Sequence, residues 1–450
     1  MYENGLLERH HAHDTEMIDL QQRSDPSGPE NERGKEGGSL WRTTPVLLLL
    51  VLLIAVLVVG LSFGSGVWLG VSLDSPGSSP TTIETHNPTG SPSAYPTYMS
   101  IPPSNITVGV YYYPWHSNNF HNGQGYLRKF LQPRQQPTLG EYNDRSTSVI
   151  TQHLAWSRQA NVRLWVTSWW GPDRMEDITT RDYILKHHDL GEHRIALMYE
   201  STSRIIPRGN VTTTNIAPDM EHICDTYFDH PNYYRVNGRP VLFVYVTRRL
   251  ERIGVLEETL LMMRSVAIGK GHNVFLVGDH AFQRPPRTEI YNPLYYLDAV
   301  TNYDVYGALG ATGGYVGRER VDSYLSDQRG WREAAHQHYS LYIPCVSPGF
   351  NDRGVRLGVG RLPLFRKLDN STTSLPGSLF RTALQGARFL VDPGMSNLLL
   401  VNSFNEWHED TQIEPAVGIK TSNPFNYTLG VEYEGYGALY LDILRNETQD

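Results

Sequence analysis

Residues 398–409 read LLLVNSFNEWHE, four apolar residues followed by polar and aromatic ones. The apolar run holds no charge and no turn residue, which favours a strand buried on both faces, as strands of parallel sheets are. A parallel sheet needs further strands of this kind, with helices between them. The sequence upstream meets both requirements.

Seven other short runs of apolar or β-branched residues precede this one. The eight candidate strands are Val108–Pro114, Val162–Ser168, Ile195–Tyr199, Val241–Val246, Val274–Val277, Ala299–Tyr303, Leu341–Val346 and Leu398–Phe404. Stretches with helical spacing lie between them, such as Val149–Ala160, Asp219–Tyr227 and Ile253–Val266. Eight alternating units in 346 residues predict an α/β fold, a (β/α)8 TIM barrel with long loops. An open doubly wound sheet is the alternative, although no Gly-x-Gly-x-x-Gly follows the first strand.

The carboxyl ends of the candidate strands, where a barrel places its active site, are rich in aromatic residues, carboxylates and amides. Aromatic faces stack on the C–H faces of sugars, and carboxylates and amides bind hydroxyls, so this composition predicts a saccharide site. Any one of these aromatic residues taken alone would more often belong to the core. The predicted substrate-binding residues are Tyr112, Tyr113, Trp169, Trp170, Glu200, Tyr245, Tyr303, Asn405, Trp407 and His408.

Glu406 and Glu409 form a carboxylate pair, three residues apart, directly after the last strand. Glycoside cleavage commonly uses two carboxylates, of which one delivers a proton and the other acts as base or nucleophile. Neighbouring like charges tend to raise the pKa of one member, which suits this division of roles. The alternative is a capping or salt-bridged surface pair, which fits poorly with the flanking Phe404, Trp407 and His408.

Other classes of chemistry find little support. The 17 histidines include no His-Glu-x-x-His, and no Gly-x-Ser-x-Gly elbow occurs, so we expect neither a metal, a cofactor nor a catalytic serine. The net charge of −8 disfavours a nucleic-acid partner. Cys224 and Cys345 either pair with each other or are small buried apolar residues.

The N-terminal part predicts a membrane anchor. No charged residue occurs from Pro45 to Leu73, which is long enough to span a bilayer. Basic residues precede this run, and none follows it until Arg128, so the N-terminus should be cytosolic. We expect a disordered cytosolic tail at 1–42, a transmembrane signal-anchor helix at 43–73, a stalk rich in Pro, Ser and Thr at 74–104, and a lumenal barrel at 105–450. Five N-glycosylation sequons, at Asn105, Asn210, Asn370, Asn426 and Asn446, all lie on the predicted lumenal side.

Residues 402–414, NSFNEWHEDTQIE, closely resemble the signature of glycoside hydrolase family 99, the endo-α-1,2-mannosidases and related endo-α-mannanases. The resemblance extends from about residue 108 to 440. It includes Tyr112-Tyr113-Pro114-Trp115, Gly140-Glu141-Tyr142 followed by Val149, Ile150 and His153, Ser168-Trp169, and the segment 343–356 with Asp352 and Arg356.

This resemblance implies a (β/α)8 barrel in a type II Golgi membrane protein. It implies retaining cleavage of an internal α-1,2-mannosidic bond in glucosylated high-mannose N-glycans, without a cofactor. By the same resemblance, Glu406 acts as base on the sugar 2-hydroxyl to give a 1,2-anhydro intermediate, and Glu409 protonates the leaving oxygen and later activates water. Glu200 and Tyr303 match residues that line the reactive subsite, and Trp169 matches a stacking residue. The implied partners are a mannose-containing glycan and a membrane; no protein partner follows from the sequence.

Two positions and one segment depart from the family. Asp410 stands where the family usually has glycine, a residue that often marks unusual backbone dihedrals, and it adds a third carboxylate near the pair. The segment from His116 to Leu139, which should line the substrate groove, is shorter and divergent. Glu200 is followed by serine in place of proline. The alternatives are therefore an endo-acting hydrolase of another α-mannan or surface glycan, and a non-catalytic glycan-binding protein on the same barrel.

Overall fold

The computed structural model describes residues 103, 105–117, 119–285, 293–310, 314–359, 361–419 and 425–449. The predicted cytosolic tail, membrane helix and stalk, apart from Pro103, lie outside these ranges. Within them, no helix combines the length and the apolar character needed to cross a membrane.

One sheet forms the centre of the fold. Its parallel strands are β1 (Thr107–Tyr112), β2 (Val162–Trp169), β3 (Arg194–Tyr199), β5 (Arg239–Val244), β6 (Phe275–Asp279), β7 (Ala299–Thr301), β8 (Leu341–Ile343), β9 (Cys345–Val346) and β10 (Leu398–Val401), in the spatial order β8-β7-β6-β5-β3-β2-β1-β10-β9. The short β4 (Arg235–Val236) pairs antiparallel with β5.

The two ends of this strand order are two halves of one strand. β8 pairs with β7, β9 pairs with β10, and only Pro344 separates β8 from β9. Proline has no backbone N–H and interrupts the ladder. Its carbonyl still accepts a hydrogen bond of 2.9 Å from the backbone N–H of Leu400. The sheet therefore closes as the predicted (β/α)8 barrel, and all eight candidate strands are found in it.

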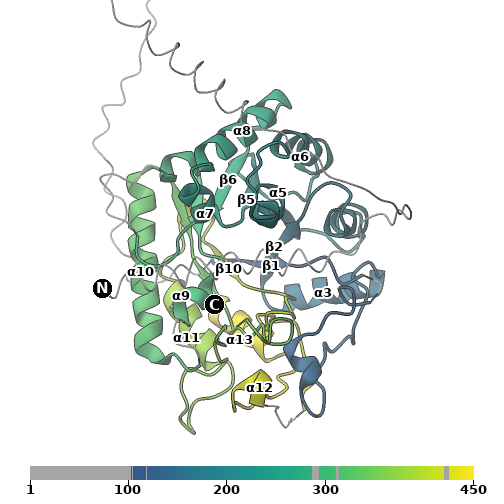
Figure 1. Ribbon diagram of the computed structural model, residues 1–450, viewed down its shortest axis with the longest axis vertical. Helices are drawn as coiled ribbons and strands as arrows, with labels where there is room; N and C mark the ends of the chain where they lie inside the picture. Colours follow the sequence, from purple (N-terminus) through teal and green to yellow (C-terminus); the bar gives the residue numbers. More distant parts are fainter. Residues whose placement is uncertain are drawn as a thin grey trace, which may run out of the picture. The chain divides into compact units, whose positions relative to one another are not determined.

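Helices surround the strands. The α-helices are α3 (Thr147–Gln159), α4 (Met175–Ile178), α5 (Ser201–Arg204), α6 (Ile216–Ile223), α7 (Thr247–Arg252), α8 (Leu256–Gly269), α9 (Val305–Leu309), α10 (Gly317–Gln337), α11 (Ser378–Ala387), α12 (Phe425–Thr428) and α13 (Leu439–Thr448). Two π-helices, η3 (Thr179–Ile184) and η5 (Cys224–Phe228), and four 3-10 helices, η2 (Leu127–Phe130), η4 (Pro207–Gly209), η7 (Pro293–Tyr296) and η8 (Pro393–Met395), complete the described elements. Figure 1 shows α3, α6, α8, α10 and α13 around the strands β1, β2 and β10.

The barrel core is apolar and closely packed. All four residues of β10 are fully buried, and burying an aliphatic side chain contributes about 1.5–3 kcal/mol. A Cβ at Gly109 would lie 2.8 Å from a methyl carbon of Leu400, so β1 carries glycine where its neighbour fills the space. Cys224 and Cys345 are both buried and free, so the disulfide alternative is wrong and the apolar alternative is confirmed.

Candidate active site

The turn that follows β10 carries the predicted carboxylate pair. Glu406 and Glu409 are 2% and 4% exposed. The turn is attached to β1 by backbone and side chain: Phe404 N–H donates to the Tyr111 carbonyl at 2.8 Å, and the Asn405 amide exchanges two hydrogen bonds with the Tyr113 backbone, at 2.8 and 3.0 Å. The side chain of Asn405, a predicted substrate contact, thus fixes the turn to the strand beside it.

Glu406 is held by His408. Its Oε1 accepts a hydrogen bond from the His408 backbone N–H at 2.8 Å and shares another with His408 Nδ1 at 2.9 Å. Burial, with Arg356 nearby, lowers the pKa of His408 to about 3, so the ring is neutral. Burial raises the pKa of Glu406 to about 8, against the opposing effect of the His408 N–H and Arg356.

Glu409 is held by an arginine. Its Oε1 lies 3.1 Å from Arg356 Nη1, and Arg356 also pairs with Asp352 at 3.3 Å, which in turn pairs with Arg361 at 3.0 Å. Burial raises the pKa of Glu409 to about 7, Arg356 lowers it and Glu406 raises it further. The two carboxyl groups therefore sit in different surroundings, and both titrate near neutral pH, where one can hold a proton while the other is ionised.

Three tyrosines surround the pair. Tyr113 and Tyr303 share a short hydrogen bond between their hydroxyls, and the Tyr245 ring packs edge-on against Tyr303 at 5.0 Å. Burial raises the pKa of Tyr113, and so do the charges of Glu406, Glu200 and Glu409. The structure thus brings these predicted residues together. Tyr306, which the sequence did not single out, also lies close to Glu409, since that carboxylate raises its pKa after burial does.

Glu200 is a third buried acid beside the pair. Ser168 donates to its Oε1 at 2.6 Å, and Trp170 Nε1 donates to the Ser168 hydroxyl at 2.9 Å. Burial raises the pKa of Glu200 to about 8, and the charges of Glu409 and Glu406 add to the effect. At neutral pH Glu200 is therefore largely protonated and can both donate to and accept from a hydroxyl group.

Three predicted substrate contacts have partners elsewhere. Tyr112 bonds His153 Nδ1 at 2.9 Å and stacks on Trp165. Trp169 donates from Nε1 to Asp177 at 2.8 Å, and Trp407 donates to Glu414 at 2.7 Å. All three side chains are almost fully buried. The hydrogen bonds of these side chains support neighbouring elements of the barrel rather than either glutamate.

A loop that the sequence only marked as divergent reaches the pair. Nδ1 of His121 lies 3.4 Å from His408 Nε2, and its ring stacks on Trp115 with a centroid distance of 4.3 Å. Phe120, His121, Asn122 and Gly123 all have positive φ, between 53° and 70°. Non-glycine residues rarely adopt this conformation, so this contact could not be predicted from the sequence.

Asp410 has the left-handed backbone that the family glycine predicted, with φ 51°. Its side chain lies 2.6 Å from Arg128 Nε and 3.2 Å from Arg366 Nε. Burial alone would raise the pKa of Asp410, but the two arginines outweigh it and hold the pKa below its ordinary value. The Asp410 carboxylate is thus paired with two arginines.

His187, His188 and Asp189 bring three possible metal-ligand atoms within 4.8 Å of one another. Both nitrogens of His187 already have partners: Nδ1 accepts from Asp189 N–H at 3.2 Å, and Nε2 lies 3.2 Å from the Thr147 carbonyl. These residues precede β3, at the end of the barrel opposite the glutamates. We assign them no part in the chemistry.

Known proteins resemble this chain in sequence and fold. A family model described as glycosyl hydrolase family 99 matches residues 104–253. Glycoprotein endo-alpha-1,2-mannosidase of Rattus norvegicus is 25% identical over 389 residues, covering 77% of this chain and 75% of that protein. The protein of the same name in Xenopus laevis is 25% identical over 388 residues, 76% of this chain and 77% of that protein. The solved GH99 endo-alpha-mannosidase from Bacteroides thetaiotaomicron shares the fold with a TM-score of 0.51 at 20% identity, over 76% of this chain and 95% of that one.

Proposed function

Since the chain belongs to glycoside hydrolase family 99 and is a glycoside hydrolase, we propose that it is a retaining endo-α-1,2-mannosidase of glucosylated high-mannose N-glycans. The observation that carries the proposal is the buried pair Glu406 and Glu409, whose carboxyl groups have separate partners and raised pKa values. A pair of this kind supplies one proton donor and one acceptor near neutral pH.

In the first step Glu406 takes the proton of the sugar 2-hydroxyl, and that oxygen attacks C1 to form the 1,2-anhydro sugar. Glu409 gives its proton to the leaving oxygen as the bond from C1 breaks. Glu406 acts in its ionised form, and its raised pKa makes that carboxylate a stronger base. Arg356, 3.1 Å from Glu409, stabilises the carboxylate that remains after proton transfer.

In the second step Glu409 takes a proton from water, and the water oxygen attacks C1 and opens the three-membered ring. Glu406 returns its proton to the 2-oxygen. Each step inverts C1, so the product retains the original configuration. Both carboxyl groups end in the protonation state in which they began.

Several buried polar atoms around the pair lack the hydrogen-bond partners that a hydroxyl-rich ligand would supply. Among the described residues, Oε2 of Glu409, Oε2 of Glu200 and the hydroxyl of Tyr306 have no hydrogen-bond partner. Each buried polar atom left in this state costs about 1–3 kcal/mol. Sugar hydroxyls bound between these groups would satisfy them, which supports a glycan as the substrate.

The position of His121 over His408 supports one second candidate. A divergent loop so near the pair would change the shape of the groove, so an endo-acting hydrolase of another α-mannan or surface glycan remains an alternative with the same carboxylates.

The full-length chain with a glucosylated high-mannose N-glycan and a chelator tests the proposal, with mass spectrometry to detect a glucose–mannose disaccharide. Glu406→Gln and Glu409→Gln should each slow release by about 10²- to 10⁴-fold and keep glycan binding, because each removes one proton-transfer group. The exposed Glu258→Gln is the control and should act as wild type.

Two results would contradict the proposal. Near wild-type turnover in either active-site variant would refute the assigned roles. A wild-type chain that binds the glycan but releases nothing from it, nor from a yeast-type α-mannan, would favour the non-catalytic glycan-binding alternative.

The proposal extends to location: an N-terminal anchor at 43–73 holds residues 105–450 in the Golgi lumen. All five sequon asparagines, at 105, 210, 370, 426 and 446, are exposed, as modification requires. We expect the chain expressed in animal cells to gain mobility on a gel after treatment with an N-glycan-removing amidase. A chain whose mobility does not change, while a secreted control shifts, would argue against the lumenal location.

A further inference from the structure

A cavity of about 250 Å³ lies beside Asp410. Arg128 and Arg366, which bind the Asp410 carboxylate, both line it. Neither Glu406 nor Glu409 lines it, and none of the predicted substrate-binding residues does. The cavity is therefore separate from the site where the proposed cleavage takes place.

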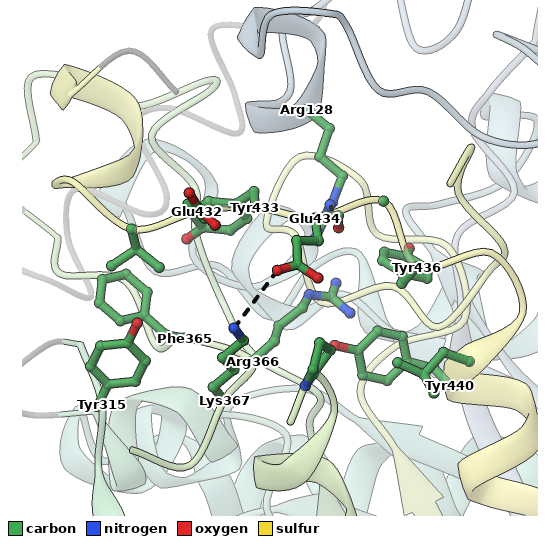
Figure 2. Close-up of a pocket in the computed structure, with 14 residues that line it drawn as sticks. Arg128, Tyr315, Phe365, Arg366, Lys367, Glu432, Tyr433, Glu434, Tyr436 and Tyr440 are labelled. Atoms are coloured by element: carbon green, nitrogen blue, oxygen red, sulfur yellow. Dashed lines mark hydrogen bonds and ion pairs between the residues drawn. The ribbon is translucent and has the colours of Figure 1, made fainter. Parts of the chain in front are cut away.

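Aromatic rings face the cavity from two sides. Figure 2 shows Tyr315, Phe365 and Tyr433 on one side and Tyr436 and Tyr440 on the other. Tyr315 meets Phe365 edge-on with a centroid distance of 5.0 Å, and Tyr436 meets Tyr440 in the same way at 4.8 Å. Edge-to-face contacts of this kind favour fixed ring orientations. Arg128 and Arg366 lie over the rings of Tyr433, Tyr436 and Tyr440, 4.7 to 5.5 Å from the ring centroids. Tyr315 and Phe365 are the rings that suit the C–H face of a small sugar ring.

Charged groups lie between these rings without a net charge. Arg128 and Arg366 share the Asp410 carboxylate, and Lys367 lies 3.8 Å from Glu434. With Glu432 added, three cations face three carboxylates. This balance favours neither an anion nor a cation, but it offers donors and acceptors to a neutral molecule with many hydroxyls.

The size of the cavity limits the ligand to one ring, since pockets for larger drug-sized ligands usually enclose roughly 300–1,000 Å³. We propose that this cavity is a second saccharide site, which binds a single neutral hexopyranose unit. The choice of mannose as the sugar to test rests on the proposed function, whereas the preference for a neutral sugar ring rests on the cavity alone.

A mannoside that carries a photoreactive diazirine tests the proposal on the full-length chain. After irradiation and digestion, mass spectrometry should find label on peptides that contain Lys367 or Tyr436. Tyr315→Ala removes an aromatic ring from the cavity lining, and Lys367→Ala removes a group that can bind hydroxyls. Each variant should therefore reduce this label at least fivefold. Tyr183→Ala, at a half-exposed tyrosine outside the cavity, is the matched control and should leave it unchanged.

The outcomes separate this inference from the proposed function. An active chain with no label in these peptides, or with label that both variants leave intact, would overturn the inference alone. Stronger competition by mannose 6-phosphate than by methyl α-mannoside would overturn the preference for a neutral sugar. Label in the cavity of a chain that cleaves no glycan would support the inference and contradict the proposed function.

Discussion

Asp410 connects the turn that carries Glu406 and Glu409 to two distant parts of the chain. Its carboxylate is 1% exposed and pairs with Arg128 of η2 and with Arg366 of the segment before α11. Gln412 adds a hydrogen bond of 3.1 Å from Nε2. Because the preceding residue is Glu409, these contacts fix the direction in which the proposed acid points.

Asp410→Asn keeps the shape of the side chain and leaves two buried guanidinium groups without their counter-ion. We expect the free energy of unfolding at pH 7 to fall by about 3–5 kcal/mol, measured by urea denaturation. Asp442→Asn, at an exposed ion pair with Arg445, is the control and should cost less than about 1 kcal/mol.

The pH dependence of the free energy of unfolding is a second test of the ion pairs of Asp410. Since the pKa of Asp410 is lowered in the folded chain, its stabilisation is present above the ordinary carboxyl pKa and is lost as pH falls through the lowered value. The difference between wild type and Asp410→Asn should shrink in acid. A difference that is equal at both ends of the range, or no larger than that of the control, would refute the ion-pair account.

At the scale of the elements, two loops hold the site by direct contact of their backbones. A Cβ at Gly354 would lie 2.1 Å from the backbone nitrogen of Leu127 and 2.2 Å from the carbonyl carbon of Tyr126. The loop of Gly354 carries Arg356, and η2 carries Arg128. Glycine is therefore required where the partners of Glu409 and of Asp410 meet.

Gly354→Ala should force these two loops apart. We expect a loss of about 1–3 kcal/mol in the free energy of unfolding and at least a tenfold loss in kcat/KM. Gly358→Ala in the same loop is the control, because a Cβ there meets nothing within 4 Å. Equal behaviour of the two variants in urea denaturation and in the disaccharide assay would rule out the close approach.

The same scale shows what the sequence could predict. Parallel strands buried on both faces are apolar runs, so all eight were predicted, but Leu341–Val346 was predicted as one strand and its break at Pro344 was not. The pair at the end of β10 followed from the rule that barrels place chemistry there. The residues that contact Glu409 and His408 could not be predicted in the same way. Arg356 was identified only within a family motif. The contact of His121 depends on a left-handed backbone that ordinary residues rarely adopt.

At the scale of the whole molecule, acids and histidines whose pKa values are shifted by burial oppose each other as pH changes. Burial raises the pKa of Asp144, Glu176 and Glu409 to about 7 and of Glu200 and Glu406 to about 8. Burial also lowers the pKa of the histidines His116, His121, His193, His230 and His408. The acids stabilise the fold fully below their unfolded pKa and lose this as pH rises, whereas the histidines lose stability as pH falls below about 6.5.

The two groups offset each other between about pH 4.5 and 6.5, and above this range only the acids still titrate. We therefore expect the melting temperature to change little from pH 5 to 6.5 and to fall toward pH 8, as the free energy of unfolding drops by on the order of 1 kcal/mol per pH unit for each acid. Thermal melts from pH 5 to 8 measure this. Glu200→Gln should flatten the fall and the exposed Glu258→Gln should not; a melting temperature that rises from pH 6.5 to 8 would contradict the prediction.

The pairing of β1 with β10 has a consequence for biosynthesis. Thr107 lies opposite Leu398, so the ribosome adds about 290 residues between the first strand and the partner on its far side. At about 5–20 residues per second, this interval is roughly 15 to 60 seconds. Until translation reaches β10, the far edge of β1 is open to pairing with another chain. The far edge of β1 is therefore protected from aggregation only when synthesis has reached β10 or when a chaperone covers it.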